Sequence, residues 1–228
     1  MNTLATVTLF CVALSPLSSG YAQTLQGGSA EAGARLDQRV EHFELRDESF
    51  LEGLAKLSMA PVTGLHLGVE EAGRERLSDP RDRSVRFSLV LEHKQVREIL
   101  DALCKFDARY TWSTDESSIN VYPKESTNEP SNLLNLQLEK IPLRDISDAE
   151  QALTPLAKQL PKEQIGYVQI GGDNTYAKPW SITFEHLTVR QFINRIAEHM
   201  GPQTSWIWQG GKDSKMFTFL KGGFRVPR

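Results

Sequence analysis

Residues 87–104 read FSLVLEHKQVREILDALC, and the interpretation of the whole chain starts from this stretch. Apolar residues alternate at Phe87, Leu89 and Leu91, which predicts a strand with one buried face. From Val96 onward, apolar residues fall at i, i+3, i+4, i+7 and i+8, the pattern of a half-buried helix. We therefore expect a strand, a tight turn and a helix.

The same pattern recurs 93 residues later. The apolar positions of this second copy are Trp180, Ile182, Phe184, Val189, Phe192, Ile193, Ile196 and Ala197. The turn matches as well, because Glu92-His93 becomes Glu185-His186. The repeat predicts that the chain is built from copies of a small strand–helix–strand unit.

Four helix starts support this interpretation. They are placed at Ser49, Gln95, Pro142 and Thr188, with separations of 46, 47 and 46 residues. Glu52 and Gln191 can complete capping boxes, and proline is well tolerated in a first turn, where its missing N–H costs nothing. One such unit buries too little surface to be stable alone, so the units are expected to pair. The predicted fold is α+β, with two tandem small domains, each built from two βαβ units whose small mixed sheets pack on helices.

The composition changes along the chain suggest boundaries between segments. We expect a signal peptide over 1–22, a flexible lead-in over 23–39, a first domain over 40–123, a polar linker over 124–132, a second domain over 133–221 and a short tail over 222–228.

The first 22 residues are typical of an export signal. Leu4 to Leu17 is almost wholly apolar, and Gly20-Tyr21-Ala22 places small residues where cleavage after Ala22 requires them. An uncleaved anchor helix is the alternative, but Ser15-Pro16 interrupts the run before the roughly 20 residues that span a bilayer. We expect a periplasmic or secreted protein without a membrane span in the mature chain. The net charge of −3 provides no basic surface for nucleic acid.

The units share a motif in which Leu-Glu ends a strand and Val/Leu-Arg-Glu/Asp-x-Ile/Leu opens a helix. It is carried by Leu91-Glu92 with 96–99, by Leu138-Glu139 with 143–146, and by Glu185 with 189–192. This pattern resembles the secretin and TonB N-terminus short domain. The resemblance covers about 40–123 well and 133–221 more loosely. It implies paired βαβ halves that act in the periplasm by protein–protein contact, without catalysis.

No residue pattern in the chain indicates a reaction. The five histidines lack metal-binding spacing, and His93 and His186 occupy matching turns, which favours a structural role. Gly210-Gly211-Lys212 lies between two predicted strands and lacks the phosphate-loop spacing. Cys104 lies on the apolar stripe of its helix, which favours a buried thiol over a reactive one. We therefore expect no catalytic residues, no cofactor and no metal.

Five side chains are candidates for contact with a partner. Arg97, Arg144 and Arg190 are expected on the first turns of three helices, where they point away from the apolar stripe; a solvated surface is the alternative. Trp206 and Trp208 correspond to Tyr110 and Trp112 and share one face of a strand. That face either packs on the helix or forms an open aromatic platform for a peptide strand or a glycan.

The predicted function is a non-enzymatic protein–protein interaction module of the bacterial cell envelope, which binds another envelope protein through an exposed sheet edge. The alternative is a glycan- or peptidoglycan-binding module that uses the aromatic pair.

Overall fold

The computed structural model describes residues 33–61, 64–71, 86–115, 118–129, 131–160, 167–171, 175–201, 203–210 and 215–220. The predicted signal peptide and tail lie outside these residues. Residues 33–36, expected in a flexible lead-in, form a helical turn, and Leu36 is buried in the core. None of the described helices is both long and apolar enough to span a bilayer.

The order of helices and strands confirms the α+β class. The first half contains β1 (Arg39–Glu48), α2 (Phe50–Ser58), β2 (Leu67–Glu70), β3 (Phe87–Gln95), α3 (Val96–Phe106), β4 (Tyr110–Asp115) and β5 (Ser118–Pro123). Two short 3-10 helices follow, η1 (Lys124–Asn128) and η2 (Leu133–Asn135). The second half contains β6 (Gln137–Asp148), α4 (Ala149–Gln159), β7 (Tyr167–Gly171), β8 (Thr175–Thr188), α5 (Val189–Met200), β9 (Ser205–Gly210) and β10 (Lys215–Leu220).

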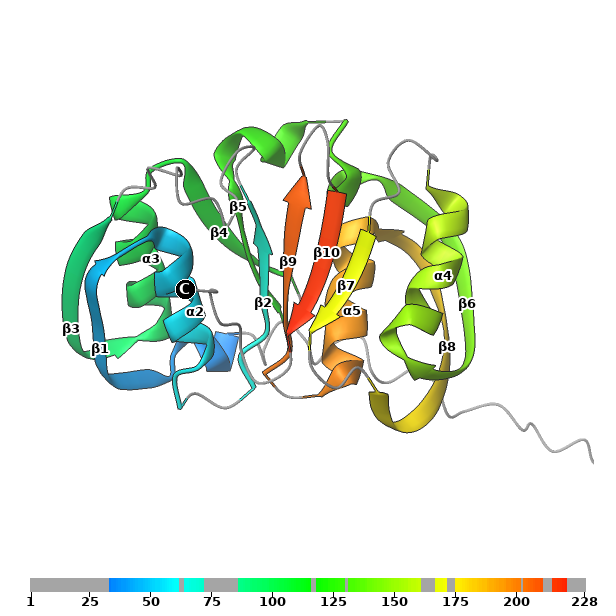
Figure 1. Cartoon of the computed structure of the whole chain (residues 1–228), viewed down its shortest axis with the longest axis horizontal. Coiled ribbons are helices and arrows are strands. Elements are labelled where there is room, and N and C mark those ends of the chain that lie inside the picture. Colours follow the sequence, from blue (N-terminus) through cyan, green and yellow to red (C-terminus); the bar gives the residue numbers. More distant parts are fainter. Residues whose placement is uncertain are drawn as a thin grey trace, which may run out of the picture.

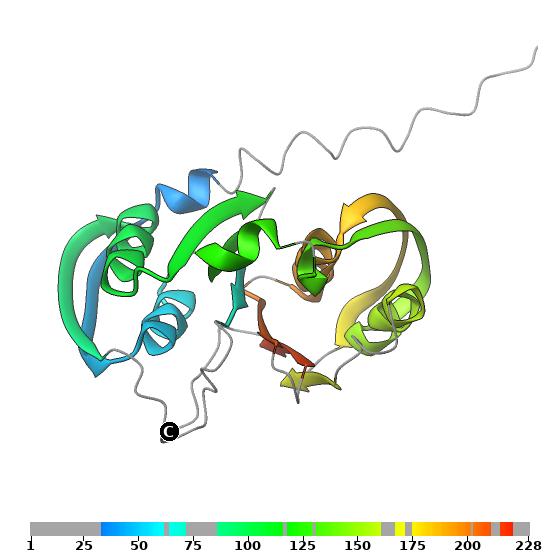
Figure 2. The same cartoon turned by 90° about the horizontal axis from the view of Figure 1, so that it is seen from above.

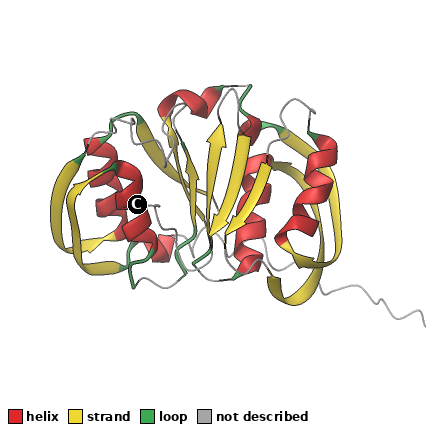
Figure 3. Ribbon diagram, viewed as in Figure 1, coloured by secondary structure: helices red, strands yellow, loops and turns green. Residues whose placement is uncertain are grey.

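Each half is a three-layer sandwich with its two helices in the middle (Figures 1 and 3). The outer layer is an antiparallel pair of long strands, β1 with β3 in one half and β6 with β8 in the other. The inner layers of both halves join into a single sheet of six described strands, in the order β4-β5-β2-β9-β10-β7. The predicted linker falls between the halves, but a common sheet holds them together.

The two halves meet where β2 pairs with β9 in parallel. In the first half β4 is antiparallel to β5, and β5 is parallel to β2. β4 therefore runs opposite to β2, whereas β9, its counterpart in the second half, runs in the same direction as β2. The strands of the second half are thus reversed relative to those of the first. The helices of the two halves therefore cover opposite faces of the sheet (Figure 2). The core clusters agree, because Ile207 of β9 packs in the first core while Trp206 and Trp208 pack in the second.

The helix expected at Pro142 is absent from that position, and this prediction is wrong. Pro142 lies within β6, and the helix begins seven residues later, at Ala149. Asp148 is its N-cap, and its carboxylate accepts a hydrogen bond from the Gln151 N–H at 2.8 Å. Proline is tolerated in β6 because a strand of a two-stranded sheet has one side free of ladder hydrogen bonds. Pro155 lies inside α4.

Each long strand contains a residue in the left-handed conformation one to three residues before the strand's last residue. The residues are Asp47, His93, Asp145 and His186, with φ values of 51°, 52°, 50° and 55°. Asp and His are among the non-glycine residues that adopt this conformation most readily. The hydroxyl of Ser88 accepts from the Asp47 N–H at 3.0 Å, and that of Ser181 accepts from the Asp145 N–H at 2.9 Å. The matching turns at His93 and His186 therefore have a backbone role.

Gly68 of β2 lies under the indole of Trp206 at the junction. A Cβ atom built there would lie 2.3 Å from Cζ2 of Trp206 and 2.8 Å from Oδ1 of Asn120. Both neighbours are buried, so neither can move aside without disturbing the core. The close approach of β2 to β9 thus requires glycine at this position.

We expect Gly68→Ala to lower the free energy of unfolding by about 1–3 kcal/mol, the cost of overpacking a closed site. The measurement is urea denaturation followed by tryptophan fluorescence. Gly33→Ala is the matched control, since no atom lies within 4 Å of the Cβ it would add. Equal stability of the two variants would contradict the tight junction.

Candidate interaction site

The junction between the halves contains a buried ion pair. Glu70 ends β2, Arg190 lies in the first turn of α5, and their side chains meet at 2.9 Å with 7% and 13% of their surfaces exposed. The Asn132 amide donates a second hydrogen bond to Glu70 at 2.7 Å, and the guanidinium lies 5.0 Å from the centre of the Tyr122 ring. Arg190 therefore fastens the second half to the first, and it is not an exposed partner-binding residue as predicted.

Three further contacts cross the same junction. The Glu71 N–H donates to the Trp208 carbonyl at 2.9 Å, and the Gln209 amide donates to the Glu71 carboxylate at 2.9 Å. Nδ1 of buried His66 lies 3.0 Å from the carbonyl oxygen of Thr204. These bonds join residues 137 or 138 positions apart in the sequence, so they hold the two halves in one relative orientation.

The tryptophan pair is internal. Trp206 is 1% exposed and Trp208 is 4% exposed. The Trp206 indole N–H donates to Oδ1 of Asn194 at 2.8 Å, and the Trp208 ring lies 4.3 Å from that of Phe217. The interpretation that this face packs on the helix is confirmed, and the exposed platform for a glycan is ruled out by burial.

The other two predicted arginines differ from each other. Arg97 lies in the first turn of α3, as expected, and pairs with Asp37 at a half-exposed position. Arg144 is exposed on β6, outside any helix. The earlier match of Arg144 to Arg97 is therefore wrong; Arg144 corresponds to Arg46 of β1, because Leu45-Arg46-Asp47 recurs as Leu143-Arg144-Asp145. The structure does not bring the predicted residues together in one site.

The segment between the halves is ordered by side-chain amides. Asn132 and Asn135 both donate to the Ser126 carbonyl, at 3.4 Å and 2.9 Å, and the Asn132 Oδ1 accepts from the Leu134 N–H at 2.9 Å. Because Asn132 also holds Glu70, this connection and the buried ion pair are parts of one polar network.

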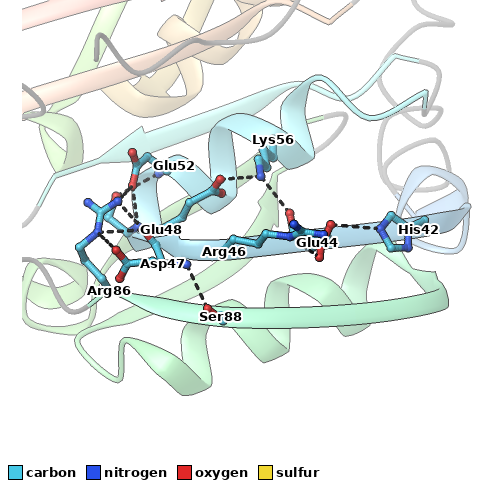
Figure 4. A network of polar contacts seen from close by, with 10 residues as sticks. His42, Glu44, Arg46, Asp47, Glu48, Glu52, Lys56, Arg86 and Ser88 are labelled. Carbon is cyan, nitrogen blue, oxygen red and sulfur yellow. Dashed lines mark hydrogen bonds and ion pairs between the residues drawn. The ribbon is translucent and has the colours of Figure 1, made fainter.

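The outer surface of β1 and β3 carries a chain of ion pairs, part of which is shown in Figure 4. Nδ1 of His42 lies 2.8 Å from Glu92, Arg46 pairs with Glu44 at 2.7 Å, and Lys56 pairs with Glu48 at 2.6 Å. The hydrogen bond to Glu92 raises the pKa of His42, and the bond from Arg46 lowers the pKa of Glu44. Exposed pairs of this kind contribute little stability, so we interpret this surface as one that is solvated.

Partial burial shifts the pKa values of two side chains on the helices, Cys104 and His199. It raises the pKa of the Cys104 thiol to about 12, and it lowers the pKa of His199, whose ring stacks on Trp180 at 3.9 Å. Among the described residues, no group of three or more His, Cys, Asp or Glu side chains is placed to hold a metal ion. The surroundings of Cys104 and of His199 do not resemble a site of acid–base or nucleophilic chemistry.

The two ends of the six-stranded sheet are the remaining candidate. In the described part of the chain, β4 pairs with β5 alone, and β7 pairs with β10 alone. An edge strand presents a row of N–H and C=O groups that can pair with another chain. Sequence periodicity found these strands but could not show that they form the ends of a common sheet.

Comparisons with protein-family models, curated proteins and solved structures find no match.

We expect Arg190→Ala to lower the free energy of unfolding by about 3–5 kcal/mol, because it leaves the Glu70 carboxylate buried without its cation. Arg144→Ala removes the same side chain from an exposed strand position and should change stability by less than about 0.5 kcal/mol. Chemical denaturation of both variants makes the comparison. A small effect of Arg190→Ala, close to that of the control, would show that the ion pair does not secure the junction.

The Cys104 thiol should react slowly with a disulfide reagent at pH 8. With a pKa of about 12, only about one molecule in 10⁴ carries the thiolate at that pH. Labelling should become fast when the protein is unfolded in urea. Labelling of the native protein at the rate of a free cysteine peptide would be inconsistent with the partial burial of this side chain.

Proposed function

We propose that this chain is a non-enzymatic protein-binding module of the cell envelope, which adds a strand of a partner protein to a free edge of its six-stranded sheet. The observation that carries the proposal is the pairing pattern of β4 and β7, each bonded on one side in the described part of the chain. Backbone groups at such an edge supply affinity for an extended segment, and side chains at alternate positions supply specificity.

The chain itself contains an example of this kind of contact. β9 of the second half is added in parallel to β2 of the first half, with Gly68, Val69 and Glu70 opposite residues 206–208. A strand edge of this fold is therefore compatible with a neighbouring strand and with the helices that accompany it.

The β7 edge suits a partner strand better than the β4 edge. Residues 167–171 of β7 read YVQIG, without charge or proline, whereas β4 ends in Asp115. Natural edge strands avoid unwanted pairing through charges, prolines and bulges, and β7 contains no charged residue and no proline.

The sequence supports an extracytoplasmic location for this activity. The apolar segment from Leu4 to Leu17, with small residues before the proposed cleavage point, is typical of an exported protein. The resemblance to the secretin and TonB N-terminus short domain favours the same compartment and the same mode of action by protein contact.

Ile170→Pro tests the proposal at the backbone. By strand register, Ile170 of β7 is equivalent to Glu71, the residue that follows β2. The Glu71 N–H points away from the first half, toward the Trp208 carbonyl. The Ile170 N–H is therefore expected to face away from β10, so proline there removes an outward donor and leaves the β7–β10 hydrogen bonds in place.

The measurement is capture of envelope proteins by the immobilised full chain, with quantification by mass spectrometry. We expect a partner that is captured by the wild type and by Arg144→Ala but at least tenfold less by Ile170→Pro. Far-ultraviolet circular dichroism checks that the variants are folded. Equal capture by the wild type and Ile170→Pro would overturn strand addition at β7.

A further inference from the structure

We propose that the β7 edge also accepts β4 of a second copy of this chain, so that copies join head to tail and extend the sheet. This inference rests on the proposed function, because it uses the same edge and the same strand addition. It names a partner strand, its direction and its register.

The strands of the two halves are equivalent in pairs. Tyr110 of β4 pairs with Pro123 and Trp206 of β9 pairs with Phe219, so β4 and β9 have the same place in their halves. Likewise β2 and β7 are each the parallel outer neighbour of the second hairpin strand, β5 or β10. The junction inside the chain, β2 with β9, is thus the junction that β7 and β4 of two copies would form.

A half-turn about an axis that crosses the strands, combined with a shift along that axis, superposes the first half on the second. This operation reverses the strands and places the helices on the opposite face of the sheet, as observed (Figures 1 and 2). The same operation applied once more places β4 of another copy beside β7, in parallel. The neighbouring halves would then meet as the two halves of one chain already meet, without a new kind of contact.

The register follows from the internal junction. Gly68, Val69 and Glu70 lie opposite Trp206, Ile207 and Trp208. The equivalent pairs between two copies are residues 167–169 of β7 opposite residues 110–112 of β4. Glycine is required at Gly68 because the Trp206 indole lies over it. The Tyr110 ring instead stacks on Phe50 of its own half at 4.3 Å.

Arg97 supplies an independent observation. It occupies in α3 the place of Arg190 in α5, one residue after the helix start, and Arg190 reaches back to Glu70 of the preceding half. Among the described residues, no half precedes the one that contains Arg97. Its Nε is buried without a hydrogen-bond partner among the described residues, while its terminal nitrogen pairs with Asp37, whose side chain is 57% exposed. In the joined copies this guanidinium would face residue 169 of the neighbour, the register position of Glu70.

A contact of this type does not close on itself. Two different surfaces meet, one from each end of the sheet, so each added copy leaves both types of edge available. The expected products are therefore a series of oligomers rather than a single dimer. Gln169 stands where the internal junction has Glu70, so the buried ion pair is not reproduced and the contact should be weaker than the internal one.

Sedimentation velocity of the full chain, across the micromolar to millimolar range in which weak contacts form, tests the proposal. The average mass should rise with concentration and pass that of a dimer. Arg97→Ala should raise the concentration at which the copies associate by at least threefold. Arg144→Ala, the matched control, should leave that concentration unchanged.

Two edge-blocked variants test the head-to-tail arrangement. Ile170→Pro blocks β7 and leaves β4 available. Thr114→Pro blocks β4 and leaves β7 available. Thr114 is exposed and lies two residues after Trp112 in β4, so its backbone N–H points to the same side of the strand as that of Trp112, away from β5. Each variant alone should remain monomeric, and an equimolar mixture should form a dimer and nothing larger. Circular dichroism confirms that both variants are folded.

A wild type that is monomeric at every concentration, or that stops at a dimer, would overturn head-to-tail self-association, and so would a mixture that stays monomeric. If the wild type is monomeric but envelope capture still depends on Ile170, strand addition to another protein stands and the self-association is wrong. If capture is independent of Ile170 and the wild type is monomeric, both proposals are wrong.

Discussion

The parallel pairing of β2 with β9 is the constraint on which the rest of this structure depends. It requires glycine at position 68, because the Trp206 ring lies where a Cβ atom would be. It also brings Glu70 into a buried environment, where the carboxylate must meet a cation, and Arg190 of α5 supplies it at 2.9 Å. The strand pairing, the indole packing and the ion pair thus stabilise one another across halves that are far apart in the sequence.

The way the halves join also determines what the ends of the sheet look like. A two-fold junction would bury the same strand from each half, and the two free edges would then be identical. Here unlike strands meet, so the free edges of the described sheet are unlike as well, β4 at one end and β7 at the other. The free strands at the two ends, β4 and β7, are therefore the counterparts of β9 and β2, the two strands that pair at the internal junction. The proposed interactions follow from this asymmetry.

The units centred on α3 and α5 could be predicted from the sequence because their apolar periodicity is strong and their repeat is regular. The third unit departs from the even spacing of helix starts, because β6 continues through Pro142 to Asp148 before α4 begins. Leu45-Arg46-Asp47 and Leu143-Arg144-Asp145 mark the same strand end, and the caps Ser49 and Asp148 lie 99 residues apart rather than 93. The roles of Arg190 and Trp206 depend on a parallel pairing between distant strands, which leaves no local pattern in the sequence.

Native-state hydrogen exchange of the Glu71 amide tests the central claim most directly, because this N–H donates to the Trp208 carbonyl across the junction. If the halves form one cooperative body, the amide should exchange only through global unfolding, with the same protection as the core of α3. Exchange of Glu71 that is much faster than that of both helical cores would show that the halves separate while each stays folded, and would contradict the account.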